Sequence, residues 1–141
     1  MLNLLTISFI IFSALVSYSD IKTRAVPRIA FIMAFLFFIV IKFFFDALGQ
    51  ILQSITGFLA GLLIFILTYF LSKKKLGLAD VWYSALIGLV LGLMSWYAAI
   101  GIACIVGIIF ILISGQHTIP LIPFMATGSI LVLFLKEFLK I

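Results

Sequence analysis

The sequence predicts an all-α, polytopic membrane protein with six transmembrane helices, folded as a single transmembrane domain over residues 1–141. Of the 141 residues, 67% are hydrophobic and only 9% are charged. A soluble domain of this size buries too small a fraction of its surface to hide so many apolar side chains. The apolar residues also fall into sustained runs, several of them about as long as a bilayer crossing requires.

Six apolar runs account for nearly the whole chain. The first has neither the basic start nor the small-residue cleavage pattern of a signal peptide, so we expect it to be retained. The fourth and sixth are short for a full crossing, so they tilt little or borrow flanking residues. The six runs are residues 2–18, 29–45, 51–71, 81–94, 97–113 and 121–135.

Basic residues predict the orientation. The first and third connections lie on one side of the membrane because two crossings separate them. They hold six basic residues, against three on the other side. This bias predicts a plasma (cytoplasmic) membrane protein whose first and third connections face the cytoplasm and whose two termini lie outside. We therefore attribute the net charge of +5 to basic residues that set the orientation in the membrane, and we expect no nucleic-acid partner. The two sets are Lys22, Arg24, Arg28, Lys73, Lys74 and Lys75, and Lys42, Lys136 and Lys140.

Two of the four acidic residues are predicted to share the cytoplasmic face. Asp20 follows the first run and Asp80 begins the fourth, with two crossings between them. An acid beside the hydrocarbon is costly to bury and marks a functional site by default. By the same count, Asp46 and Glu137 fall on the outer face, where we expect ordinary interfacial charges.

Each cytoplasmic acid also has a plain structural interpretation. Asp20 suits a helix end balanced by Lys22 and Arg24. Asp80 suits the N-cap of the fourth helix, after Gly77 as a loop breaker. We also expect Gly77 to provide a positive φ before that helix. The lysine triplet at 73–75 is first of all an anchor at the lipid headgroups.

Two carboxylates that share a site can hydrolyse a peptide bond. One, ionised, takes a proton from water, and the other, protonated, polarises the scissile carbonyl and assists the leaving amine. Like charges at close range keep one proton on the pair, which titrates as a unit. Beside Asp80, the small residues Gly77 and Ala79 leave room for an extended substrate backbone.

Three segments carry a resemblance to a known family. They are residues 18–27 (YSDIKTRAVP), 77–80 (GLAD) and 119–128 (IPLIPFMATG). In this order they resemble the boxes of the type IV prepilin and preflagellin peptidases, the aspartic GxGD membrane proteases. The resemblance implies that Asp20 and Asp80 are catalytic, and that Gly77, Ala79, Lys22 and Pro27 shape the site or contact substrate.

The same resemblance implies a prepilin-like peptide substrate, whose basic leader is cleaved at the cytoplasmic face of the lipid bilayer. It implies no cofactor, and it leaves the oligomeric state open. The chain departs from the family pattern at Ala79, where the family has Gly, and at Trp82, where it often has Lys. The N-terminal extension with cysteine pairs is also missing, which indicates a short form that only cleaves.

The sequence also leaves other functions open. A small transporter or ion-binding subunit also uses membrane acids, but usually near mid-membrane. A catalytically inactive family member is a further alternative, because of Ala79. A serine site at Ser114 and His117 is disfavoured, since the pair sits in one connection. We expect no metal, because no H-E-x-x-H helix is present and Cys104 is the single cysteine.

Two pairs of glycines recur at a spacing of four residues, Gly57 with Gly61 and Gly88 with Gly92. Small residues at this spacing let membrane helices approach closely. We expect them to pack helices within the monomer, with a substrate helix as the alternative partner.

Overall fold

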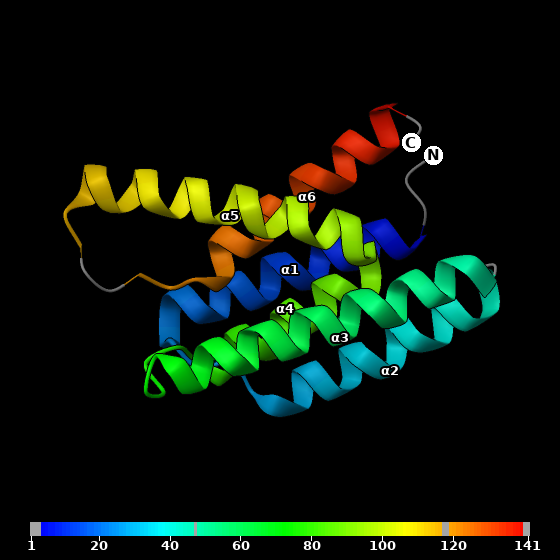
Figure 1. The fold of residues 1–141 in the computed structure, drawn as a ribbon, viewed down its shortest axis with the longest axis horizontal. Coiled ribbons are helices and arrows are strands. Elements are labelled where there is room, and N and C mark those ends of the chain that lie inside the picture. The colour runs from blue at the N-terminus through cyan, green and yellow to red at the C-terminus, as the bar shows by residue number, and fades with distance from the viewer. Residues whose placement is uncertain (1–3, 47, 117–118, 140–141) are drawn as a thin grey trace. The chain divides into compact units, whose positions relative to one another are not determined.

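A computed structural model of the chain describes residues 4–46, 48–116 and 119–139. Within these ranges the chain forms six α-helices and no strands, which confirms the predicted all-helical class (Figure 1). The helices are α1 (Leu4–Thr23), α2 (Arg28–Phe45), α3 (Leu48–Leu71), α4 (Leu78–Leu91), α5 (Leu93–Ser114) and α6 (Ile122–Leu139).

Five of the described helices are long and apolar enough to cross a bilayer: α1, α2, α3, α5 and α6. The remaining helix, α4, has 14 residues. At about 1.5 Å per residue it rises only about 21 Å, against a hydrocarbon core about 30 Å thick. The structure therefore supports several membrane crossings, and the sixth predicted crossing stays a prediction.

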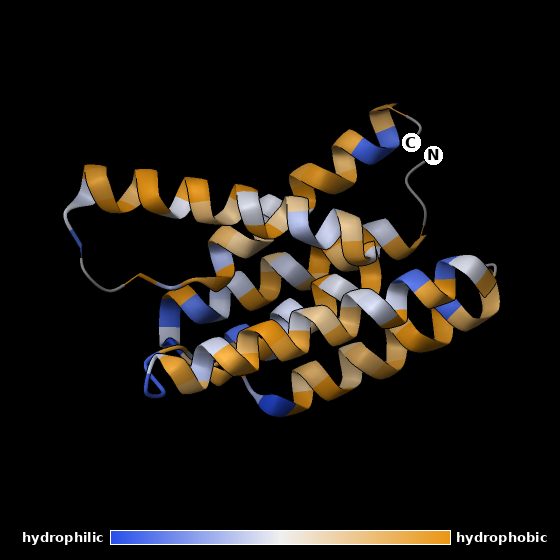
Figure 2. Ribbon diagram, in the orientation of Figure 1, coloured by the Kyte–Doolittle hydropathy of each residue, from blue (hydrophilic) through white to orange (hydrophobic). Residues whose placement is uncertain are grey.

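The outer surfaces of the helices are apolar. Large side chains such as Phe43, Leu71 and Ile113 are exposed. Figure 2 shows hydrophobic helix bodies and hydrophilic residues at helix ends and connections. Such a surface matches the bilayer interior and not water, so the chain is a multi-pass membrane protein.

The chain divides into two compact units. The first unit consists of α1, α6 and the part of α5 from Tyr97 onward. The second unit consists of α2, α3, α4 and the first turn of α5, up to Trp96.

In the second unit, glycines bring α3 and α4 into backbone contact. A Cβ on Gly57 would clash with the carbonyl of Gly88, and one on Gly61 would lie 2.6 Å from the carbonyl oxygen of Ser84. Trp96 adds a buried hydrogen bond, since its Nε1–H donates to Ser84 Oγ at 3.0 Å. The glycine pairs therefore pack α3 against α4, which confirms the prediction of packing within the monomer.

Gly92 separates α4 from α5. Its φ of +82° and ψ of 171° lie in a region that only glycine adopts readily. The predicted boundary, between residues 94 and 97, was therefore wrong by a few residues. The break falls inside a continuous apolar stretch, where no polar residue marks it.

The side chains of α4 are buried on nearly every face. The buried residues include Asp80, Val81 and the continuous run 83–91. Beyond the first two residues of α4, Trp82 is the exposed exception, and its ring packs edge-on against Phe35, with ring centroids 6.2 Å apart. Phe35 packs in turn against Phe58 of α3 at 5.7 Å. These ring contacts link α2, α3 and α4 within the second unit.

In the first unit, α6 packs on both α1 and α5. A Cβ on Gly128 of α6 would clash with the carbonyl of Ala99, so α5 and α6 approach at backbone distance. The face that α1 buries includes Thr6, Phe9 and Ser13. This packing brings the start of α6 to the end of α1 that carries Asp20.

Candidate active site

Asp20 lies in the last turn of α1, at a helix end that the chain closes tightly. The N–H of Arg24 donates to the Asp20 carbonyl at 2.9 Å, and Arg24 adopts the left-handed conformation, with φ of +50°. The hydroxyls of Ser19 and Thr23 both donate to the Ala25 carbonyl, at 3.1 and 2.9 Å. Helices commonly end on such a left-handed residue, although glycine is the usual choice. The turn therefore holds the acid at a defined helix end.

The carboxylate of Asp20 is half-buried and has two stabilising neighbours. The backbone N–H of Ile122, the first residue of α6, and the guanidinium of Arg24 both interact with it. The N-terminus of a helix carries partial positive charge, which suits a nearby carboxylate. Lys22 takes no part in this contact, since its Nζ lies over the ring of Tyr18, 5.6 Å from the centroid. Of the two predicted balancing cations, the structure thus supports Arg24.

Asp80 lies in the first turn of α4 and is only 9% exposed. Its Oδ2 accepts a hydrogen bond from the backbone N–H of Gly77 at 3.2 Å. Gly77 is the N-cap residue and Asp80 the third helical residue, so the prediction of Asp80 as N-cap was wrong by three positions. The carboxylate reaches back to the start of its own helix, where its charge suits the helix dipole.

Gly77 does not provide a positive φ, because its φ is −70°. That prediction was wrong, and a different reason for glycine replaces it. A Cβ at Gly77 would lie 3.0 Å from Asp80 Oδ2 and 3.7 Å from its Cγ. Glycine therefore leaves room for the carboxylate to fold back on the N-cap.

The other two predicted site-shaping residues lie at helix starts. Ala79 is helical and partly exposed, one residue before the acid. Pro27 is the N-cap residue of α2, with φ of −65° and ψ of 133°, and is exposed. Proline in this extended conformation starts a helix without needing a backbone donor. Contact of these two residues with substrate stays a prediction.

Sequence reasoning missed the structure of the lysine connection between α3 and α4. The N–H of Lys74 donates to the Tyr69 carbonyl at 2.9 Å, and that of Lys73 to the Phe70 carbonyl at 3.1 Å. This pair of bonds is the Schellman motif, which usually has glycine where Lys73 stands. Lys73 and Lys74 both have positive φ, of 53° and 65°. The connection that precedes Gly77 is therefore an ordered turn, a feature that the lysines alone could not signal.

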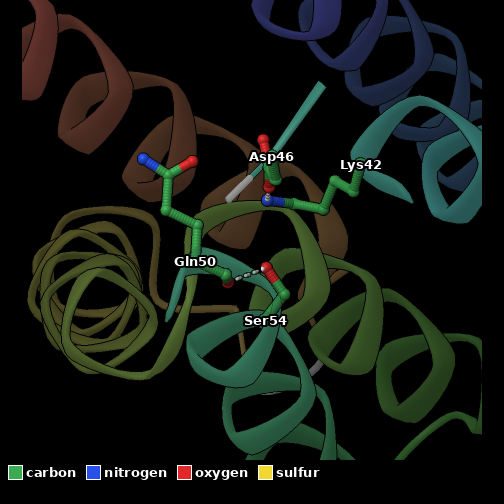
Figure 3. Close-up of polar contacts among 4 residues, drawn as sticks. All are labelled: Lys42, Asp46, Gln50 and Ser54. Carbon is green, nitrogen blue, oxygen red and sulfur yellow. Dashed lines mark hydrogen bonds and ion pairs between the residues drawn. The ribbon is translucent and has the colours of Figure 1, made fainter. Parts of the chain in front are cut away.

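The acid predicted at the outer face, Asp46, forms an ion pair in the second unit. Lys42 Nζ lies 2.7 Å from Asp46 Oδ2, and both side chains are largely buried (Figure 3). Nearby, Ser54 Oγ donates to the Gln50 carbonyl at 3.0 Å (Figure 3). The pairing of Asp46 with Lys42 agrees with its assignment as a structural charge. Glu137 lies on an exposed part of α6.

An apolar cavity of about 270 Å³ opens beside this ion pair. Leu89 of α4 contributes to its wall, about 13 Å along the helix from Asp80 at 1.5 Å per residue. The cavity is thus remote from the acid within the second unit. Its lining is Ile39, Lys42, Phe43, Ile51, Ser54, Ile55, Phe58 and Leu89.

The disfavoured serine site has little support in the structure. Ser114 ends α5, is exposed, and its Oγ accepts a hydrogen bond from the Gln116 N–H at 3.4 Å. His117 lies outside the described residues. Across the described ranges, no three His, Cys, Asp or Glu side chains are grouped as a metal site would require.

The helices and the two acids define a class of protein: a polytopic membrane protein with two carboxylates at helix ends, each in contact with a backbone N–H. A comparison with protein families matches residues 7–112 to the type IV leader peptidase family. The chain therefore belongs to the type IV leader peptidase family. Membership implies a membrane-embedded peptidase with a prepilin-like substrate. No curated protein and no solved structure matches the chain.

Proposed function

We propose that the protein is an aspartic endopeptidase that removes the leader of prepilin-like or preflagellin-like substrates at the cytoplasmic face of the plasma membrane. The observation that carries the proposal is the family match, because residues 7–112 include Asp20, Asp80 and the GLAD segment at 77–80. The local structure supports it, since each acid has its own helix end and its own backbone contact.

In the proposed mechanism Asp20 and Asp80 act as a pair on one water molecule. One carboxylate removes a proton from water while the oxygen attacks the scissile carbonyl carbon, and the other acid donates a proton to the carbonyl oxygen. The tetrahedral intermediate then collapses, the C–N bond breaks, and the amine leaves with a proton from the pair. The products are a new carboxylate and a new amine, with one water consumed.

The charge distribution within the second unit supports the proposed orientation. The start of α2, the end of α3 and the start of α4 lie at one end of this unit, because the three helices alternate in direction (Figure 1). That end carries Arg28 and the lysines 73–75 together with Asp80, whereas Lys42 at the other end is neutralised by Asp46. Excess basic charge favours the cytoplasmic side. The proposal has Asp80 facing the cytoplasm and both termini outside.

The test is a cleavage assay with a tagged prepilin-like substrate, followed as a shift on a gel. Asp20→Asn and Asp80→Asn keep the size of each side chain and remove its acid chemistry, so each is expected to abolish the shift. Glu137→Gln makes the same kind of change at an exposed acid and is expected to leave cleavage intact. Thermal unfolding of each purified variant checks that it folds.

Cleavage that survives in both aspartate variants would refute the two-acid mechanism. If the wild-type protein cleaves none of the prepilin-like substrates offered, the result would favour the inactive family member. Proton or cation flux through the wild-type protein in vesicles, abolished by the same substitutions, would favour the transporter.

A further inference from the structure

The apolar cavity of about 270 Å³ in the second unit has a buried floor and an exposed rim. The floor includes Ser54 of α3 and Leu89 of α4, which are 3% and 8% exposed. The rim includes Ile39 and Phe43 of α2 and Ile55 of α3, which belong to the exposed apolar surface of the helices. Because that surface faces the bilayer interior, the cavity opens toward lipid and not toward water.

The cavity begins near two helix ends and extends inward from there. Lys42 is the fourth residue from the end of α2, and Ile51 is the fourth residue of α3. From Ile51 to Phe58 the lining follows α3 for about 10 Å along the helix axis. One leaflet of the hydrocarbon core is about 15 Å thick, half of about 30 Å, so the cavity fits within one leaflet.

The volume and lining of the cavity restrict what it can hold. A membrane helix is about 10–12 Å across, so it cannot enter. A polar peptide finds few partners, because the Ser54 hydroxyl already donates to the Gln50 carbonyl at 3.0 Å. An apolar cavity of about 150 Å³ in another protein holds benzene, so this one has room for about ten carbon atoms in a flexible chain. The acyl chain of a phospholipid has this size and chemistry.

The ion pair of Lys42 and Asp46 lies beside the cavity, near the end of α2 (Figure 3). A largely buried ion pair is a weak source of stability, because the desolvation of the two charges offsets their attraction. One mutual bond leaves further donors on the ammonium and further acceptor positions on the carboxylate. A phosphate can accept from Lys42 and a primary ammonium can donate to Asp46. The pair therefore complements a headgroup that carries both charges.

We propose that this cavity binds one phosphatidylethanolamine molecule, with part of an acyl chain between α2 and α3 and the headgroup on Lys42 and Asp46. The chain fills space that would otherwise leave the lining atoms without contacts, so the bound lipid stabilises the second unit. The site is independent of the proposed peptidase function, because the cavity is remote from Asp80 and the lipid takes no part in cleavage.

The first test counts bound lipid. The protein is placed in nanodiscs with equal amounts of phosphatidylethanolamine and phosphatidylglycerol, extracted in a mild detergent, and examined by native mass spectrometry. Ile55→Trp and Ile39→Trp each place a larger side chain at the rim, from α3 and from α2. Leu63→Trp is the matched control, because Leu63 is exposed on α3 two turns beyond Ile55 and is not part of the lining.

The wild-type protein is expected to retain one phosphatidylethanolamine, and Leu63→Trp to retain it equally. The two rim variants are expected to lower the retained fraction about tenfold, which corresponds to about 1.4 kcal/mol of binding free energy. Retention in both rim variants equal to the wild type would overturn the site. A wild-type dimer that both rim variants dissociate would also overturn it, in favour of a second copy of the chain at the cavity.

The second test measures the choice of headgroup. The wild type is expected to prefer phosphatidylethanolamine, and Asp46→Asn to shift the ratio toward phosphatidylglycerol about fivefold, because Lys42 then presents its charge alone. Glu137→Gln removes an exposed acid of α6 and is expected to leave the ratio unchanged. A wild-type preference for phosphatidylglycerol, or an equal shift in both variants, would overturn the headgroup contact.

Thermal unfolding in detergent gives a third readout and also checks that each variant folds. Added phosphatidylethanolamine is expected to raise the Tm of the wild type and of Leu63→Trp, because a ligand that binds only the folded state stabilises it. The Tm of Ile55→Trp is expected to respond little. An equal rise in all three proteins would overturn binding in the cavity. None of these readouts uses cleavage, so their outcome is separate from that of the peptidase assay.

Discussion

A backbone contact between α3 and α4 gives a sharp prediction, the effect of Gly61→Ala on stability. A Cβ at this position would lie 2.6 Å from the carbonyl oxygen of Ser84 and 3.1 Å from Trp96 Nε1. A relaxed carbon–oxygen contact is about 3.3 Å or longer, so α3 and α4 must separate by about 0.7 Å. The obstructing oxygen belongs to the backbone, so no side-chain rotation relieves the clash.

Two opposing effects set the magnitude. Alanine in an open helix position is favoured over glycine by about 0.5–1 kcal/mol. Overpacking a close interface costs about 1–3 kcal/mol, and separation of the helices also strains the buried bond from Trp96 to Ser84. We therefore expect Gly61→Ala to be about 2 kcal/mol less stable than a matched Gly→Ala change without the clash. Gly49→Ala is that control, because Gly49 lies on the same helix, α3, and no atom lies within 4 Å of a Cβ added there.

The assay is equilibrium unfolding in mixed micelles of a mild detergent and dodecyl sulfate. Gly49→Ala is expected to keep or slightly raise the free energy of unfolding, whereas Gly61→Ala lowers it. Trp82 and Trp96 are the two tryptophans, so Trp82→Phe leaves the fluorescence of Trp96 as a local reporter. In that background Gly61→Ala is expected to shift the emission of Trp96 to longer wavelength. Equal stabilities for the two alanine variants would refute backbone contact between α3 and α4.

Two further predictions concern the start of α4. Gly77→Ala moves the carboxylate of Asp80, because the new Cβ lies 3.0 Å from its Oδ2. We expect kcat for prepilin-like substrates to fall about tenfold, because a small displacement of a reacting group lowers the rate by this factor or more. Thermal unfolding should change little, because φ of −70° suits alanine, and an unchanged kcat would contradict the positioning role. Lys73→Gly relieves a left-handed residue with φ of +53° and is expected to stabilise the protein by about 1 kcal/mol, about 3 °C in Tm. Lys75→Gly removes the same charge outside the left-handed pair, so an equal rise in its Tm would show that the gain came from charge alone.

Sequence patterns were sufficient for the helical class and for the order of the helices. Apolar length identified each helix within a few residues, because a bilayer crossing requires a minimum run of apolar side chains. Asp20 and Asp80 could be singled out by their position at run ends, and the three boxes gave the family that the comparison confirms. The spacing of Gly57 and Gly61 also indicated close helix packing before the structure identified α4 as the partner.

Sequence patterns could not show which helices pack together, or which side of each helix faces the protein and which faces lipid. In a soluble protein the polar face of a helix reports its orientation, but lipid and protein core are both apolar. The predicted boundary between the fourth and fifth runs therefore missed Gly92, where the backbone breaks, because this position carries no polar signal. The lysine turn after α3 was hidden for a related reason, because Lys73 stands where glycine would have signalled the left-handed end.

The sequence by itself determined that the chain forms apolar helices, that two acids lie at helix ends, and that its motifs are those of leader peptidases. Only the tertiary structure decided what surrounds Asp20, because the packing of α6 on α1 brings the N–H of Ile122 to this acid. The physical reason is the range of the interactions. Helix formation and the bond from the Gly77 N–H to Asp80 depend on neighbouring residues, whereas the setting of Asp20 depends on a backbone group that is distant in the sequence.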